Sequence, residues 1–160
     1  LEKLSGLIIP GGESTTMARL MRDYGLNAPL RKLIGSGFPA MGTCAGMIIL
    51  SRGAAEVGAP TLGVMDIDVR RNGFGRQIDS FETDLSIPAI GEELFHGVFI
   101  RAPFIERIGV GVEVLARLAD GTAVAARQGN ILALSFHPEL TDDLRLHVYF
   151  MDMVRNSVKR

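Results

Sequence analysis

The chain has 160 residues, of which 47% are hydrophobic and 22% are charged, and its formal net charge at pH 7 is -1. A chain of this length and composition can bury a substantial core, so we expect a single domain. The near-zero charge, without blocks of like charge, argues against nucleic acid or an anionic membrane as a partner. No apolar run approaches the roughly 20 residues that span a bilayer, and no signal-like segment opens the chain, so we expect a cytoplasmic protein.

The chain contains one cysteine and three histidines. One cysteine cannot form an internal disulfide, and a reducing compartment preserves a free thiol. These few side chains do not indicate a dedicated zinc site, so we expect no metal ion.

The first elements predict a strand, a glycine turn and two helices. Leu7-Ile8-Ile9 is typical of a buried strand, and Pro10-Gly11-Gly12 ends it. Glu13-Ser14-Thr15-Thr16 supplies candidates for the N-cap of a helix, whose apolar stripe is formed by Met17, Leu20, Met21 and Tyr24. A second helix is predicted to begin at Asn27 and Pro29, and Gly35 and Gly37 are predicted to close it.

The next stretch surrounds the only cysteine. Gly42-Thr43-Cys44-Ala45-Gly46 has the G-x-[nucleophile]-x-G form of a nucleophile elbow, in which a strand turns sharply into a helix. The helix would begin at Cys44, where its dipole favours the thiolate form. The alternative is that Cys44 is a small buried hydrophobic residue, and this stretch alone leaves both interpretations open.

Short strands follow. Segments around Leu62 to Val69 and Phe81 to Ile87 alternate polar and apolar residues and flank a glycine-rich loop that carries Arg71 and Arg76. The two arginines are either solvated surface charges or ligand contacts, and the glycines favour a close ligand. A strand over Val98-Phe99-Ile100 ends at Arg101-Ala102-Pro103.

The last part predicts an antiparallel meander and a helix. Three strands, Val112 to Leu118, Thr122 to Gln128 and Ile131 to Phe136, are joined by two tight turns. Thr141 would cap the final helix, which carries an apolar stripe over Leu146, Tyr149, Phe150 and Met153. With the β-α-α-β-α start, this order predicts a three-layer α/β domain with a mostly parallel mixed sheet.

His137 and Glu139 follow the last strand and, on an extended backbone, point to the same face, so Glu139 can orient His137. Reactive groups collect at the carboxyl ends of strands, where Cys44 also lies. The three side chains are the parts of a Cys-His-Glu triad, and the N–H groups of Gly12 and Ala45 are candidates for an oxyanion hole. The alternatives are a structural histidine and a solvated carboxylate. His96 and His147 lack a comparable context.

Three segments carry a resemblance to the class I glutamine amidotransferases. They are Pro10-Gly11-Gly12-Glu13-Ser14-Thr15-Thr16, the Gly42 to Gly46 elbow and Ser135-Phe136-His137-Pro138-Glu139-Leu140-Thr141. Arg71-Asn72-Gly73-Phe74-Gly75-Arg76-Gln77, Phe99-Ile100-Arg101-Ala102-Pro103 and Ala125-Ala126-Arg127-Gln128-Gly129 are most similar to the glutaminase subunits of pyridoxal 5′-phosphate synthase complexes. The resemblance covers essentially the whole chain.

The resemblance implies a flavodoxin-like fold and hydrolysis of L-glutamine to glutamate and ammonia without a cofactor. Cys44 would attack the side-chain amide, His137 would transfer protons and Glu139 would hold His137. The implied glutamine contacts are Gly12, Glu13, Ser14, Arg71, Ile100 and Arg101. Ammonia would pass to a barrel-shaped synthase subunit of a lyase complex that makes the vitamin B6 cofactor.

Two alternatives stay open: a glutaminase serving another synthase, and a catalytically silent regulatory subunit. The resemblance also implies that family members have about one further βα unit, on the order of 30 residues, before the segment matching Leu1. We therefore expect residues 1–160 to form an N-terminally incomplete glutaminase domain.

Overall fold

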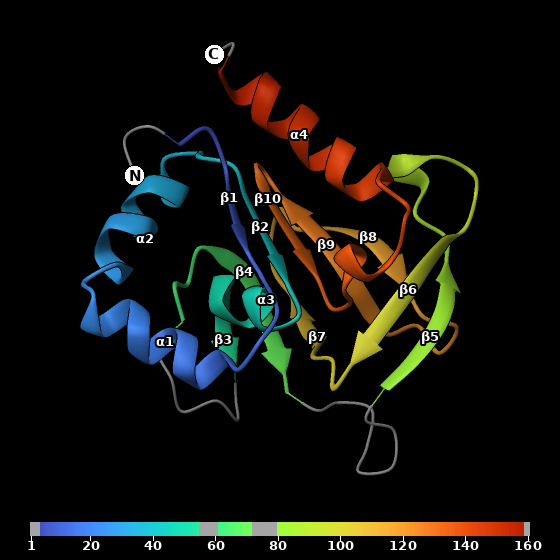
Figure 1. Cartoon of the computed structure of the whole chain (residues 1–160), viewed down its shortest axis with the longest axis horizontal. Coiled ribbons are helices and arrows are strands. Elements are labelled where there is room, and N and C mark those ends of the chain that lie inside the picture. Colours follow the sequence, from blue (N-terminus) through green and yellow to red (C-terminus); the bar gives the residue numbers. More distant parts are fainter. Residues whose placement is uncertain (1–3, 55–60, 72–79, 159–160) are drawn as a thin grey trace.

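The computed structural model describes residues 4–54, 61–71 and 80–158 (Figure 1). The strands are β1 (Leu7–Ile9), β2 (Ala40–Thr43), β3 (Ser51–Ala54), β4 (Met65–Arg70), β5 (Ser80–Leu85), β6 (Phe95–Ile100), β7 (Phe104–Ile108), β8 (Glu113–Arg117), β9 (Ala123–Gln128) and β10 (Ile131–Leu134). The helices are α1 (Ser14–Asp23), α2 (Asn27–Gly35), α3 (Ala45–Leu50) and α4 (Arg145–Val158), with 3-10 turns η1 (Pro88–Ile90) and η2 (Pro138–Leu140).

One mixed sheet of eight strands forms the middle layer. Its order is β1-β2-β10-β9-β7-β4-β3, with β8 paired to β9. Strands β1, β2 and β10 run parallel, so their carboxyl ends meet at one edge of the sheet. Strands β5 and β6 form a separate antiparallel pair beside this sheet (Figure 1). The edge at which β1, β2 and β10 end is therefore the place to look for the predicted site.

Two hydrophobic cores lie on opposite faces of the sheet. Side chains alternate along a strand, so Ala40 faces the core that includes α1, α2 and α3, while Met41 faces the core that includes α4 and β6. Figure 1 shows α1, α2 and α3 on one side of the sheet and α4 on the other. The predicted three-layer α/β architecture is confirmed. No helix in the described part of the chain has the length and apolarity needed to cross a bilayer.

Several predicted elements have the expected bounds. Helix α2 runs from Asn27 to Gly35 as predicted, and Glu13 is the N-cap of α1, where its side chain accepts the N–H groups of Thr15 and Thr16. The predicted meander is formed by β8, β9 and β10, which pair as antiparallel neighbours. The tight turns between these strands determine that arrangement.

More strand pairs of the main sheet are antiparallel than the sequence led us to expect. It also joins β4 to β7 and β7 to β9, while parallel pairing holds at β1–β2, β2–β10 and β3–β4. The sequence did not indicate β3 or β7. Pairing with β4 and β9 defines β7, and pairing with β4 defines β3.

The start of the final helix was predicted too early. Thr141 has an extended backbone, with φ −126° and ψ 160°, because it ends the 3-10 turn η2. Helix α4 begins at Arg145, whose N–H donates to the Asp143 carboxylate at 3.0 Å. Asp143, and not Thr141, therefore satisfies a free N–H group at this helix start.

Candidate active site

Cys44 lies between β2 and α3 in a strained turn. Its backbone has φ 49° and ψ −107°, a conformation that residues other than glycine rarely adopt. A side chain at Gly46 would overlap the Ile9 carbonyl oxygen, and one at Gly42 would overlap the Gly46 backbone. The two glycines therefore allow the strand and helix to approach closely, and the predicted elbow is confirmed as a backbone feature.

His137 and Glu139 lie at the end of the neighbouring strand β10. His137 Nδ1 is 2.7 Å from Glu139 Oε1, and the His137 N–H donates to the Val98 carbonyl oxygen of β6 at 2.9 Å. We expected an extended backbone to make this contact, and that expectation was wrong. Pro138–Leu140 is a 3-10 turn. That turn brings the carboxylate back toward the ring, and β6 holds the backbone of His137.

The surroundings of the His137 ring favour its protonated form. Its pKa is raised to about 9, mainly by interaction with the Cys44 side chain and also by Glu139, while burial opposes the shift. The His137 side chain is 13% exposed and that of Glu139 is 44% exposed. At neutral pH the ring is therefore protonated and lies beside the Cys44 side chain, so it can act as an acid that gives up a proton.

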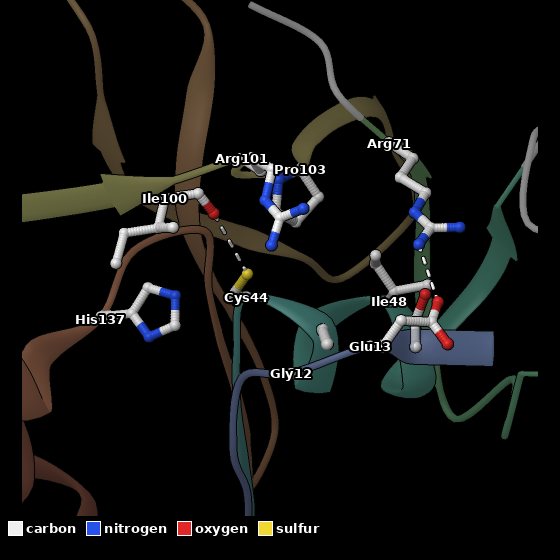
Figure 2. A pocket seen from close by; sticks show the side chains of 11 residues that line it. Gly12, Glu13, Cys44, Ile48, Arg71, Ile100, Arg101, Pro103 and His137 are labelled. Atoms are coloured by element: carbon white, nitrogen blue, oxygen red, sulfur yellow. Dashed lines mark hydrogen bonds and ion pairs between the residues drawn. The ribbon is translucent and has the colours of Figure 1, made fainter. Parts of the chain in front are cut away.

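Cys44 and His137 line one cavity of about 450 Å³ (Figure 2). The cavity lies at the carboxyl ends of β1, β2 and β6. Its lining consists of Gly12, Glu13, Ser14, Cys44, Ala45, Ile48, Arg71, Ile100, Arg101, Pro103 and His137. Glu139 reaches it only through His137. The structure thus brings together every residue that the sequence singled out for catalysis, glutamine contact or the oxyanion hole.

An ion pair closes one end of the cavity. Arg71 Nη2 is 2.8 Å from Glu13 Oε1. Figure 2 marks this ion pair with a dashed line. Hydrogen bonds from Thr15 and Thr16 hold the pKa of the Glu13 carboxyl well below its usual range. Glu13 therefore stays negative and places the Arg71 guanidinium at the cavity wall.

Ser14, Arg101 and Ile100 contribute further polar groups to the cavity wall. Ser14 is 1% exposed, and its hydroxyl has no hydrogen-bond partner within the described residues. Arg101 has φ 43°, and its side chain lies above Cys44 in Figure 2. The Ile100 carbonyl oxygen is 3.9 Å from Cys44 Sγ. A ligand with both a charged group and hydrogen-bonding groups suits this wall.

One arginine of the predicted glycine-rich loop is not described, and the two remaining histidines do not line the cavity. Arg76 belongs to residues 72–79, outside the described part of the chain. His147 is on α4, and His96 is on β6 with both ring nitrogens at carboxylates. Across residues 4–54, 61–71 and 80–158, no group of three or more His, Cys, Asp or Glu side chains is arranged to hold a metal ion.

Sequence reasoning missed three contributors to this site. Ile48 lines the cavity, and its spacing of one helical turn from Cys44 was the available signal. Pro103 lines it too, although its segment had been noted only for its resemblance. Gly11 packs against the His137 ring, where any side chain would clash. That contact joins distant parts of the chain and leaves no local trace in the sequence.

Fold and site together define an α/β protein with a cysteine at a nucleophile elbow. The chain belongs to the SNO glutamine amidotransferase family, whose model matches residues 1–156. It is 59% identical over 152 residues to the "Pyridoxal 5'-phosphate synthase subunit PdxT" of Pelotomaculum thermopropionicum, covering 95% of this chain and 77% of that protein. It is 56% identical over 154 residues to the protein of the same name from Moorella thermoacetica, covering 96% and 81%.

Solved structures agree on the fold. One titled "Crystal structure of glutamine amidotransferase" matches with a TM-score of 0.90 and 52% identity, covering 96% of this chain and 81% of that one. A structure of PurLQS from Thermotoga maritima matches with a TM-score of 0.68 and 18% identity, covering 99% and 82%. At that identity the second match supports the fold alone. The flavodoxin-like amidotransferase fold expected from the sequence is confirmed.

Proposed function

We propose that this chain is a glutaminase, the subunit of a pyridoxal 5′-phosphate synthase that hydrolyses L-glutamine and supplies ammonia to a barrel-shaped synthase subunit. The observation that carries the proposal is the placement of Cys44 at a strained elbow beside His137, which is in turn bonded to Glu139 at 2.7 Å. Family membership and relatives named as synthase subunits support the choice of substrate and partner.

The reaction has two halves, formation of a thioester and its hydrolysis, and Cys44 and His137 act in both. The Cys44 thiolate attacks the side-chain carbonyl carbon of glutamine, and the His137 imidazolium gives its proton to the departing nitrogen, so ammonia leaves and a thioester remains. His137 then takes a proton from water, whose oxygen attacks the thioester. Glutamate leaves, and thiolate and imidazolium are restored. Glu139 keeps the ring oriented, and its charge stabilises the imidazolium.

The oxyanion and the amino acid group are assigned to the rest of the cavity wall. The N–H groups of Gly12 and Ala45 are the proposed donors to the tetrahedral oxyanion. The glutamine α-carboxylate faces the guanidinium groups of Arg71 and Arg101, which suit a carboxylate geometrically. Glu13, Ser14 and the Ile100 carbonyl are left for the α-ammonium group and further hydrogen bonds. No cofactor takes part in these steps.

The proposed partner is another protein, and neither nucleic acid nor a membrane has a place in the reaction. Free ammonia is useful only if a synthase collects it, which supports an obligatory complex. A nucleophilic thiol has to stay reduced, which supports a cytoplasmic location.

The test is glutamate release from glutamine by the full-length protein, with and without a pyridoxal 5′-phosphate synthase barrel subunit. Wild type should release glutamate with the partner, and Cys44→Ala should not. Cys44→Ala is a matched control because it removes one sulfur atom from a buried site. Equal rates would refute the enzymatic role and favour a silent regulatory subunit. Glutamate release that requires a different synthase would favour a glutaminase serving that other synthase.

A further inference from the structure

Strands β5 and β6 form an arm that is separate from the main sheet. Within the described residues, each of the two strands pairs only with the other, from Ser80 opposite Ile100 to Leu85 opposite Phe95. We call these two strands the β5–β6 arm. A two-stranded antiparallel pair is marginally stable by itself, so its side-chain contacts decide how firmly it is held.

The arm contacts both reacting residues. The Val98 carbonyl oxygen accepts the His137 N–H at 2.9 Å, and the Ile100 carbonyl oxygen is 3.9 Å from Cys44 Sγ. On the inner face, the Phe99 ring stacks on Phe81 with centroids 4.4 Å apart. Any displacement of β6 therefore moves the backbone that holds the base and the carbonyl beside the nucleophile.

His96 joins the two strands on the outer face of the arm. Its Nδ1 is 3.0 Å from Asp84 Oδ1, and its Nε2 is 2.9 Å from Glu82 Oε2. A neutral imidazole has one N–H and can donate to only one of these carboxylates, whereas an imidazolium donates to both. The geometry is therefore that of a protonated His96. The two carboxylates also raise the pKa of His96, Asp84 more than Glu82.

Two other charged groups near β6 contact other residues. Glu139 of η2 contacts His137, and the Arg145 guanidinium of α4 lies over the Phe95 ring, on the inner face, while paired with Asp143. From β5, Glu82 and Asp84 face His96. When His96 is neutral, these two carboxylates lose their shared cation and repel each other.

We propose that protonated His96 is a positioning residue for the reaction, which it serves by holding β5 against β6 and so keeping the Val98 and Ile100 carbonyls in place. This inference rests on the glutaminase function proposed above. The stabilisation is complete below the ordinary histidine pKa of 6.5 and is lost as pH rises through the raised pKa of folded His96. The arm thus makes the site less ordered in alkaline solution.

Three variants separate a positioning role from a merely structural one. His96→Arg keeps a cation with several hydrogen-bond donors at every pH. His96→Leu removes the cation and the donors, and the double variant E82Q/D84N removes the two carboxylates that face His96. Glu92→Gln, a nearby exposed carboxylate outside the His96 contacts, is the matched control. We would measure kcat/KM for glutamine in the assembled complex from pH 6 to pH 9.5 and divide each value by that of His96→Arg. The pH dependence that both proteins share, including the titration of His137, cancels in this ratio.

The ratio of wild type to His96→Arg should be near one at low pH and fall about threefold as His96 loses its proton. His96→Leu and E82Q/D84N should be about threefold below His96→Arg already at low pH and show no further decline in the ratio. Glu92→Gln should follow wild type. A flat wild-type ratio, or His96→Leu equal to His96→Arg throughout, would overturn the proposal.

Amide hydrogen exchange of Gly97 and Val98, without substrate, distinguishes the two proposals. Corrected for intrinsic rates, exchange should become faster with pH in wild type but not in His96→Arg. If glutamate release fails while this exchange pattern holds, the glutaminase function is wrong and the arm contact is right. If exchange is the same in both proteins, the positioning role of His96 is wrong whatever the activity.

Discussion

The two reacting side chains are held by contacts of different kinds. Cys44 is 8% exposed at an elbow where close backbone packing leaves room only for glycine at two neighbouring positions. His137 is held by polar contacts, to Glu139 through its ring and to Val98 through its backbone. The position of the nucleophile therefore depends on steric fit, whereas the position and charge of the base depend on hydrogen bonds that respond to pH and to single polar substitutions.

The largest expected effect is at the elbow. Gly46→Ala should lower the free energy of unfolding by about 3 kcal/mol and abolish turnover, because the new methyl group overlaps the Ile9 carbonyl. Gly35→Ala is the matched control at the end of α2, where nothing lies within 4 Å and stability should rise by about 0.5 kcal/mol. Urea denaturation measures both. Similar stability of the two variants would show that the elbow is not sterically constrained.

The second prediction concerns His137 and the carboxylate that orients it. Glu139→Gln should reduce kcat at least about tenfold with little change in KM, because the ring loses its orienting carboxylate. Loss of this contribution lowers the pKa of His137 from about 9, so the alkaline limb of the rate profile should move to lower pH. Glu106→Gln, which alters an exposed carboxylate on β7, is the control. An unchanged pH profile and kcat would remove Glu139 from the mechanism.

The cavity wall offers a test of binding. Arg71→Met should raise KM for glutamine roughly tenfold with a smaller change in kcat, because it removes a guanidinium proposed to bind the α-carboxylate. Arg70→Met is a matched control, since the exposed Arg70 pairs with Glu106 at 3.5 Å and does not line the cavity. Equal effects of the two substitutions on KM would place the α-carboxylate elsewhere.

The smallest effect is expected far from both halves of the site. Tyr149→Phe removes the hydroxyl that accepts a hydrogen bond from Arg127 at 2.7 Å and should cost about 1 kcal/mol of stability. Turnover should stay at the wild-type level because Tyr149 contacts neither Cys44 nor His137. Thermal denaturation and glutamate release measure the two quantities. A clear loss of kcat would mean that α4 affects the site more than the contacts indicate.

The two halves also differ in how far the sequence predicted them. The elbow is local, so five consecutive residues around Cys44 were enough to predict its turn and the following helix. The base side depends on contacts between distant segments. His137 bonds to Val98, and Arg145 bonds to the Glu93 and Leu94 carbonyls, so neither the 3-10 turn nor the later start of α4 follows from local propensity.

The same reason explains what was missed in the sheet and the pocket. Strand β7 is defined by pairing with β4 and β9, and β3 by pairing with β4. The role of His96 needed the register that sets it opposite Asp84. A sequence indicates which residues suit a strand, but a neighbouring strand decides which side chains meet.

The central claim is that Cys44 is the nucleophile and that His137 is the acid and base that transfers protons for it. The most direct measurement is the NMR titration of the His137 ring in wild type and in Cys44→Ala, assigned with a His137 variant. The account predicts a pKa of about 9 in wild type, falling toward the ordinary 6.5 when the sulfur is removed, because Cys44 is the main cause of the shift. The same pKa in both proteins, or a wild-type pKa near 6.5, would contradict it.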